Sequence, residues 1–313
     1  MISGIEFDKL INKSISGNVA KSTRRILFND IDDELMKQGQ WHIDIMSGMG
    51  TVVIIKYDNR FFAITAMHVL KGLKDENGNY RNASPFWMPT CFGAIWETMQ
   101  DFFMPKKLWN IGELIEGDER VIIDDICMIE LYHPSFESFP NYYLDLDKNT
   151  DIFSTKEHFF EGRYLMVSGY PFYLNNFDWE VTHTDPKMTH STNIHRQTTI
   201  GTFYKDDSLG HIKFENLADD VTHENSRGMS GGIIFDVQEN IEDTHFCGLI
   251  LNISNNLCTF LPSYIIKEAI LNYKNASCEI IDPAELQVKK NLTKEQEGAL
   301  NYLYKILSTN PKG

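Results

Sequence analysis

The chain has 313 residues, of which 42% are apolar, enough for one large all-β domain or two ordinary domains with substantial cores. Its formal net charge of −15 excludes a general nucleic-acid-binding protein, because such proteins present a basic face to phosphate groups. No secretory signal opens the chain, and no apolar run approaches the roughly 18–20 residues of a membrane span, so no membrane partner is expected. Five scattered cysteines without a C-x-x-C pair favour free thiols in the cytoplasm.

The clearest local pattern in the first third of the chain is a β-hairpin. Residues 51–57 and 60–65 are rich in β-branched and apolar side chains, and Asp58-Asn59 between them supplies a turn. The second strand of this hairpin leads directly to His68.

Many other short segments have the composition of strands and are separated by Gly, Pro, Asn and Asp. They lie at residues 22–28, 121–131, 163–171, 198–204, 211–214, 232–236, 246–252 and 257–261. This pattern predicts a mainly β protein built from antiparallel barrels or sandwiches.

Helical patterns are confined to the ends of the chain and to one irregular stretch. Residues 6–11 favour a short helix, residues 263–273 favour a longer one, and Thr293 begins a capping box, T-K-E-Q, for a last helix. Residues 71–120 lack a regular pattern apart from a partly helical spacing at 91–103. We expect them to form an insertion packed against the main domain.

Residues 228–232 have the sequence G-M-S-G-G, in which glycines lie on both sides of one serine. Glycine permits backbone conformations that a β-carbon forbids, so the Ser230 hydroxyl can stand exposed while neighbouring amide N–H groups converge. An acyl-transfer enzyme needs such a nucleophile beside a site that stabilises a developing oxyanion. The alternative is a glycine-rich turn without chemistry.

A histidine and an aspartate in suitable settings lie upstream of this serine. His68 follows a strand directly, although a satisfied core histidine is the alternative for this residue by itself. Asp125 begins a second apolar stretch and competes with Asp124, because strand alternation sends neighbouring side chains to opposite faces. The histidines between residues 183 and 223 match no standard ligand spacing, so neither a metal nor another cofactor is expected.

Three segments together carry a family resemblance. Residues 65–68 are T-A-M-H, residues 125–129 are D-I-C-M-I, and residues 228–232 are G-M-S-G-G. They resemble the T-A-A-H, D-I-A-L-L and G-D-S-G-G motifs of the trypsin-like (chymotrypsin-fold) serine peptidases, and the second motif selects Asp125 over its neighbour. Gly169-Tyr170-Pro171 resembles a turn of the bacterial V8-like and HtrA-like branches.

The resemblance, which spans about residues 45–265, implies the chemistry of that family. Ser230 Oγ would attack a peptide carbonyl, and His68 would take its proton and return it to the leaving amine. Asp125 would hold the imidazole in the required tautomer. The backbone N–H groups of Gly228 and Ser230 would form the oxyanion hole.

The chain departs from the family at the residue before the nucleophile. Secreted members carry an aspartate there, which pairs with a new N-terminus after zymogen cleavage, whereas this chain has Met229. Activation by N-terminal trimming is therefore not expected. Gly50-Thr51 matches the opening of the first hairpin in the bacterial branches only loosely.

Substrate preference is expected to depend on Glu224. The resemblance places this residue at the base of the S1 pocket, where a buried carboxylate would attract a Lys or Arg side chain at P1. The alternative is a solvated loop residue, since exposed glutamate is the norm. The strand at 248–252, which includes Leu251, would form the other wall of the pocket.

The resemblance implies a fold of two six-stranded antiparallel β-barrels of the chymotrypsin type, with a helical insertion and C-terminal helices. The expected division is an N-terminal extension at 1–40, a first barrel at 41–160 with His68, Asp125 and an insertion at about 71–120, a second barrel at 161–275 with Ser230, and a C-terminal helical extension at 276–313.

We therefore expect a cytoplasmic serine endopeptidase that cleaves protein substrates and is narrowly specific or latent, under the control of an activator or inhibitor protein. A bacterial stress or antiphage pathway is suggested by family analogy alone. The alternative is a catalytically silent trypsin-like scaffold that binds peptides or partner proteins. The presence of all three side chains argues against that alternative.

Overall fold

The structure is a computed structural model that describes most of the β-rich part of the chain. The described residues are 4–29, 46–71, 86–92, 102–115, 125–132, 140–175, 177–178, 191–192, 194–206, 209–214, 222–238 and 240–281. The predicted helix that begins at Thr293, much of the predicted insertion at about 71–120, and Asp124 lie outside these residues.

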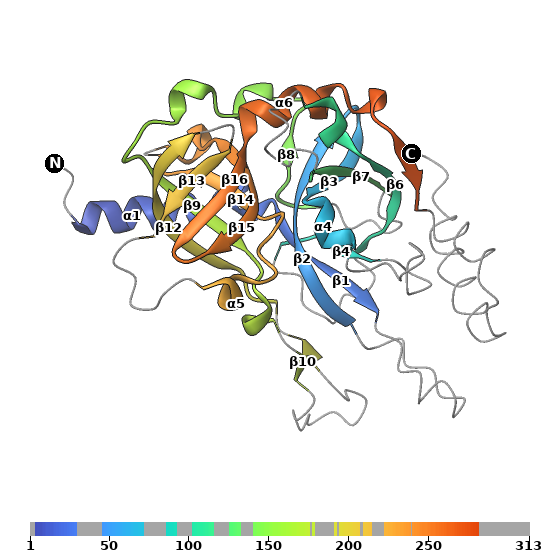
Figure 1. Ribbon diagram of the computed structural model, residues 1–313, viewed down its shortest axis with the longest axis horizontal. Helices are drawn as coiled ribbons and strands as arrows, with labels where there is room; N and C mark the ends of the chain where they lie inside the picture. The colour runs from blue at the N-terminus through green and yellow to red at the C-terminus, as the bar shows by residue number, and fades with distance from the viewer. Residues whose placement is uncertain are drawn as a thin grey trace.

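Strands alternate with short helical segments along the described chain (Figure 1). The strands are β1 (Thr23–Asn29), β2 (Met46–Tyr57), β3 (Arg60–Thr65), β4 (Met88–Pro89), β5 (Phe102–Phe103), β6 (Pro105–Trp109), β7 (Cys127–Leu131), β8 (Leu144–Asp145), β9 (Tyr164–Gly169), β10 (Phe177–Asp178), β11 (Ser191–Thr192), β12 (Gln197–Asp206), β13 (Gly210–Lys213), β14 (Ile233–Asp236), β15 (Phe246–Ser254), β16 (Leu257–Pro262) and β17 (Cys278–Ile280).

The α-helices are short, and 3₁₀ turns connect several strands. They are α1 (Gly4–Ile15), α2 (Asn18–Lys21), α4 (Met67–Lys71), α5 (His223–Ser226) and α6 (Ser263–Leu271), with 3₁₀ helices η2 (Ile111–Leu114), η3 (Thr150–Ile152), η4 (Lys156–His158), η5 (Phe172–Leu174), η6 (Ile241–Asp243) and η7 (Tyr273–Asn275). In the part of the chain that the structure describes, no helix is long and apolar enough to cross a membrane.

The predicted hairpin is confirmed by β2 and β3, which pair antiparallel. Its turn residues Asp58 and Asn59 both have positive φ, 54° and 57°, which two-residue hairpin turns require and which Asp and Asn tolerate. Strands β1, β9 and β12 to β16 and helix α6 also lie where the sequence predicted them. The protein is mainly β, as expected.

The second half of the chain forms a closed antiparallel barrel in the order β12-β13-β16-β15-β14-β9. Ile233, at the start of β14, pairs with Leu249 of β15 on one side and with Ser168 of β9 on the other. Buried side chains such as Val167 and Phe260 pack together in one hydrophobic cluster of this barrel. One of the two predicted six-stranded barrels is therefore present.

The first half forms a seven-stranded sheet in the order β1-β2-β3-β7-β6-β17, with β8 beside β2. Among the described strands this order does not close, so a second barrel is not shown. β6 lies within the predicted insertion and β17 within the predicted helical extension, yet both are strands of this sheet. They pair with partners distant in sequence, Leu108 with Ile129 and Cys278 with Trp109, which local spacing cannot reveal.

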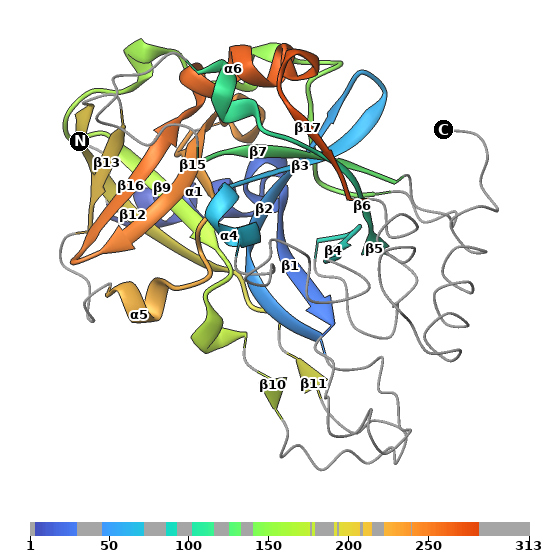
Figure 2. The ribbon, with the colours of Figure 1, turned by 45° about the vertical axis from the view of Figure 1, so that its right-hand side comes forward.

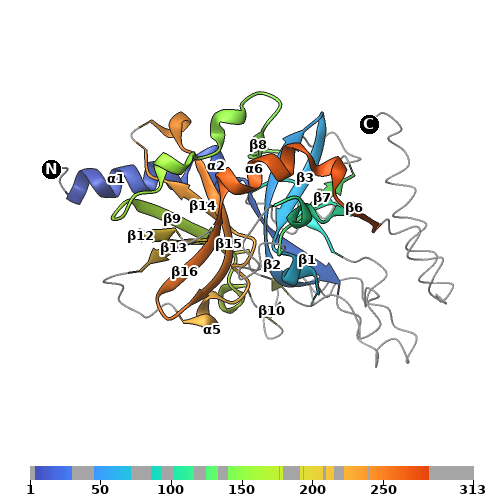
Figure 3. The same cartoon turned by 45° about the horizontal axis from the view of Figure 1, so that its top comes forward.

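A shared hydrophobic core joins the sheet to the barrel. One cluster contains Val53 and Phe62 from the sheet, Phe235 and Phe246 from the barrel, and Ile266 from α6. Figure 3 shows α6 running from the barrel toward the sheet. Because each such buried side chain contributes about 1.5–3 kcal/mol, the two halves are held in one relative position.

A buried ion network closes the end of β14 inside the barrel. The Asp236 carboxylate is fully buried and accepts hydrogen bonds from Arg163 (2.7 Å), from the His245 backbone N–H (2.7 Å) and from Gln238 (2.5 Å). Burial by itself would raise the pKa of Asp236, but the hydrogen bonds from His245 and Gln238 outweigh burial and lower it.

We expect Asp236→Asn to lower the free energy of unfolding by about 3 kcal/mol at pH 7, because it leaves the partly buried Arg163 cation without its partner. A carboxyl whose pKa is depressed by folding stabilises the protein above its unfolded pKa of about 4 and loses that contribution as the pH falls through the folded value. Urea denaturation should therefore show a large wild-type advantage at pH 7 that shrinks below about pH 4. The exposed Asp243→Asn is the control, and an equal Asp236 effect at both pH values contradicts this assignment.

Candidate active site

The hairpin and strand β7 bring His68 and Asp125 to the same edge of the sheet. Thr65, the last residue of β3, pairs with Cys127, the first residue of β7, so the residues just beyond these strand ends meet. Asp125 Oδ1 accepts the His68 backbone N–H at 2.8 Å, and Asp125 Oδ2 hydrogen-bonds His68 Nδ1. One carboxylate thus fixes both the backbone and the ring of the histidine. With Nδ1 bonded to Asp125, Nε2 is the ring nitrogen that can accept a proton.

His68 lies on α4, which Figure 2 shows at the junction between the sheet and the barrel. The His68 side chain is 45% exposed and that of Asp125 17%. The carboxylate is thus shielded from water while the imidazole faces the junction. Cys127, close to Asp125, is fully buried, and both burial and the Asp125 charge raise the pKa of its thiol, so it does not compete as a nucleophile.

Ser230 lies in a turn whose backbone requires glycine. Gly228 and Gly231 have φ of +97° and +78°, in the left-handed region that side chains disfavour. A Cβ at Gly231 would lie 2.1 Å from both the Thr51 carbonyl oxygen and Thr65 Oγ1. The glycines therefore let the turn pack directly against the first hairpin.

Thr51 of β2 joins this turn to the rest of the site through its backbone and its hydroxyl. Its N–H donates to the Ser230 carbonyl at 3.1 Å, and its Oγ1 donates to the Gly228 carbonyl at 2.9 Å. The same Oγ1 accepts the Tyr170 N–H at 2.9 Å, and the Thr51 carbonyl accepts Thr65 Oγ1 at 2.8 Å. A residue of the sheet therefore positions the serine turn of the barrel.

Two amide groups of the turn are free for a ligand. Within residues 226–232, every backbone N–H except those of Gly228 and Ser230 donates to a carbonyl of the described chain. The preceding carbonyls, of Arg227 and Met229, accept N–H groups of Phe172 and Gly232, both at 2.8 Å. In a planar trans peptide the N–H points opposite to the C=O, so these bonds turn both free amides away from the barrel backbone.

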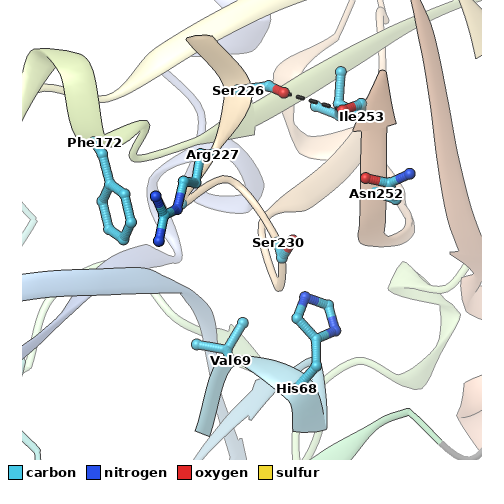
Figure 4. A pocket seen from close by; sticks show the side chains of 9 residues that line it. His68, Val69, Phe172, Ser226, Arg227, Ser230, Asn252 and Ile253 are labelled. Atoms are coloured by element: carbon cyan, nitrogen blue, oxygen red, sulfur yellow. Dashed lines mark hydrogen bonds between the residues drawn. The ribbon is translucent and has the colours of Figure 1, made fainter. Parts of the chain in front are cut away.

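The Ser230 hydroxyl and His68 face each other but are not hydrogen-bonded in the described structure. Ser230 Oγ donates to the Leu251 carbonyl at 3.1 Å. Figure 4 shows the His68 ring directly below Ser230, on the opposite side of the opening. Rotation of the hydroxyl about the Cα–Cβ bond would exchange Leu251 for His68, and such bonds are often long before substrate binds.

A cavity of about 260 Å³ opens between the two halves at this point. Ser226, Asn252 and Ile253 lie on one side of the Ser230–His68 pair, and Val69, Phe172 and Arg227 lie on the other (Figure 4). Gly228 and Ser230, whose amides are free, also line it.

Of the two expected specificity residues, neither lines this cavity. Glu224 is exposed on α5, in agreement with the solvated alternative for this residue. Leu251 is half-buried, packs against the hydrophobic core, and contributes its carbonyl to Ser230. The sequence placed His68, Asp125 and Ser230 in a trio, and the structure brings these three together.

The sequence did not assign roles to Thr51, Phe172 or Arg227. The signal in the sequence for Thr51 was the loose match of Gly50-Thr51 to the segment that begins the first hairpin in the bacterial branches. A hydroxyl directly after a glycine can approach another backbone closely. Phe172 acts through its backbone N–H, which its side-chain type does not reveal.

No protein-family model matches this sequence, and no curated protein matches it either. Among the residues that the structure describes, no three His, Cys, Asp or Glu side chains gather closely enough to hold a metal ion. The five cysteines are free thiols. Function must therefore be inferred from the geometry of the cavity.

Proposed function

We propose that this protein is a serine endopeptidase of trypsin-like fold in which His68, Asp125 and Ser230 act together. One observation supports the proposal. An imidazole held by a carboxylate, a serine in a glycine turn and two free amides lie together at one cavity. The proposal includes a chymotrypsin-like pairing of two six-stranded barrels, with the sheet of the first half as the first of them, and a cytoplasmic setting.

The reaction follows from the roles of these atoms. Ser230 Oγ attacks the peptide carbonyl carbon while His68 Nε2 takes the hydroxyl proton, and Asp125 stabilises the imidazolium. The carbonyl oxygen becomes an oxyanion that accepts the Gly228 and Ser230 N–H groups. The C–N bond then breaks, the amine leaves with the proton from Nε2, and water releases the acyl group by the same steps.

An extended polypeptide is the substrate that suits the cavity. In the described structure, β15 pairs with β14 as far as Leu249, whereas residues 251–254 pair only with β16 on the other edge. The edge opposite β16 lies beside Ser230 and has no backbone partner there among the described residues, although the Leu251 and Ile253 carbonyls accept the Ser230 and Ser226 hydroxyls. An extended peptide can add to such an edge as a further strand. The acyl part of a substrate would therefore lie along residues 251–254.

A fluorophosphonate probe tests the proposal, because it labels only a serine activated for attack. Wild-type protein should be labelled at Ser230, and Ser230→Ala and His68→Ala should lose labelling while melting as wild type does. Ser16→Ala, which removes an exposed serine hydroxyl that does not line the cavity, is the control and should be labelled normally.

The hydrogen bond from the Ser230 hydroxyl to the Leu251 carbonyl supports a second candidate function, a catalytically silent scaffold that binds peptides. Folded wild-type protein that takes no label, with or without candidate activator proteins, would establish the scaffold and refute the peptidase.

A further inference from the structure

Arg227 introduces the only fixed charge into the cavity. Among the described residues that line it, no Asp, Glu or Lys occurs, and His68 is the only other titratable side chain. The chain as a whole is strongly acidic, with 44 Asp and Glu against 29 Lys and Arg. The overall composition of the chain therefore does not explain a positive charge in this cavity.

The structure holds Arg227 against Phe172 at two points. The guanidinium carbon lies 5.3 Å from the centre of the Phe172 ring, a cation–π distance, and the Arg227 carbonyl accepts the Phe172 N–H at 2.8 Å. Within the described chain, no carboxylate lies within salt-bridge distance of this guanidinium. Arg227 lines the cavity and is exposed to solvent, and Figure 4 shows its guanidinium beside Phe172.

The side of the cavity on which Arg227 lies determines which part of a substrate it meets. The acyl part of a peptide would follow the exposed β15 edge, on the side of Asn252 and Ile253. Arg227 and Phe172 lie on the opposite side of Ser230 (Figure 4). The group that departs with the amine must therefore pass this guanidinium.

We propose that Arg227 selects substrates with an aspartate or glutamate among the first two residues after the scissile bond. The inference rests on the proposed peptidase function and deepens it by naming a substrate class. A planar guanidinium binds a carboxylate in two-point geometry, and one charge-assisted hydrogen bond is sufficient for about a tenfold preference.

The net charge of −15 repels acidic substrates at long range, whereas Arg227 acts on a substrate by direct contact. Charges farther than the Debye length, about 8 Å at physiological salt, are largely screened, whereas a guanidinium in contact with its carboxylate is screened only in part. The local cation therefore decides the preference, and the global charge lowers only the rate of encounter.

Three quenched fluorescent peptide mixtures test this inference. All share an equimolar mixture of residues on the acyl side and carry Glu-Glu, Gln-Gln or Lys-Lys directly after the scissile position. Wild type should cleave the Glu mixture with kcat/KM about tenfold above the Gln mixture. Arg227→Gln should cleave both equally, and Arg227→Glu should prefer the Lys mixture. The exposed Lys156→Gln is the matched control for loss of one positive charge and should keep the wild-type ratio.

The outcomes separate this inference from the proposed function. Cleavage of all mixtures at equal rates, or probe labelling without cleavage of any, overturns the role of Arg227 alone. Absence of both labelling and cleavage overturns the peptidase as well. If the variants do not fold, the wild-type Glu-to-Gln ratio must still fall as salt is raised, and a ratio independent of salt contradicts the inference.

Discussion

Replacing Asp125 with asparagine is expected to slow peptide hydrolysis by about 10⁴-fold while the fold persists. The Asp125 carboxylate accepts two N–H groups of one residue, the His68 backbone N–H and the ring Nδ1–H. Asparagine offers one oxygen and one NH₂ in the same place. If its oxygen faces the backbone, the NH₂ faces Nδ1 and forces the proton onto Nε2, so His68 cannot accept the proton of Ser230.

If instead the asparagine oxygen faces the ring, its NH₂ opposes the His68 backbone N–H and α4 must shift. Either arrangement removes one of the two contacts, so the defect does not depend on the rotamer. The measurement is kcat for any peptide mixture that wild type cleaves, together with the rate of fluorophosphonate labelling. ¹⁵N NMR of His68 should show a changed tautomer.

Asp147→Asn is the matched control for this variant. Asp147 also accepts two backbone N–H groups, of Asp58 at 2.7 Å and Asn59 at 3.0 Å, but at the exposed hairpin turn away from the cavity. It should lose some stability and retain kcat. A loss of kcat of less than tenfold in Asp125→Asn would show that Asp125 does not set the tautomer of the acting histidine.

Replacing Thr51 with valine is expected to lower kcat by about 10²-fold, approaching the effect of losing one oxyanion donor. Valine keeps the shape of threonine but removes the Oγ1 that joins the Gly228 carbonyl to the Tyr170 N–H. The turn then loses its hydroxyl tie to the sheet. The resemblance to trypsin-like peptidases places Met229 where secreted members of that family use an ion pair, and under the proposed function the Thr51 hydroxyl is the contact that positions the turn.

A purely structural role for Thr51 would lower stability alone, whereas a positioning role also weakens binding of the tetrahedral state. The valine variant should also lose about 1–3 kcal/mol of stability, because two buried polar groups become unpaired. Its affinity for a peptide boronate, which forms a tetrahedral adduct, should fall far more than its KM changes. Thr51→Ser should restore both, and Thr23→Val, which removes another buried hydroxyl bonded to a carbonyl, should lose stability alone. Equal defects in the two valine variants would refute positioning by Thr51.

Local sequence was sufficient for most strands, and the resemblance to trypsin-like peptidases supplied the three proposed reacting side chains. The turn at Asp58-Asn59 specifies the first hairpin because its positive φ angles suit these two residue types within a few positions. Gly228 and Gly231 indicate the serine turn in the same way, because glycine suits the positive φ angles found there. Patterns of this kind depend on neighbours in the chain, so they can be read without knowledge of the fold.

Contacts between distant segments could not be predicted in this way. The pairing of β17 with β6, residues that sequence spacing assigned to an extension and an insertion, depends on backbone hydrogen bonds between strands about 170 positions apart. The exposure of Glu224 depends likewise on the position of α5 in the folded chain.

By itself, then, the sequence predicted a mainly β protein and its hairpin, because turns and strand alternation are local properties, and its resemblance to the trypsin-like peptidases pointed to His68, Asp125 and Ser230. Only the tertiary structure showed that Thr51 bonds to the serine turn and that Arg227 rather than Glu224 lines the cavity. These features arise where the sheet and barrel meet, and the hydrogen bonds of Thr51 across that junction join residues up to 179 positions apart.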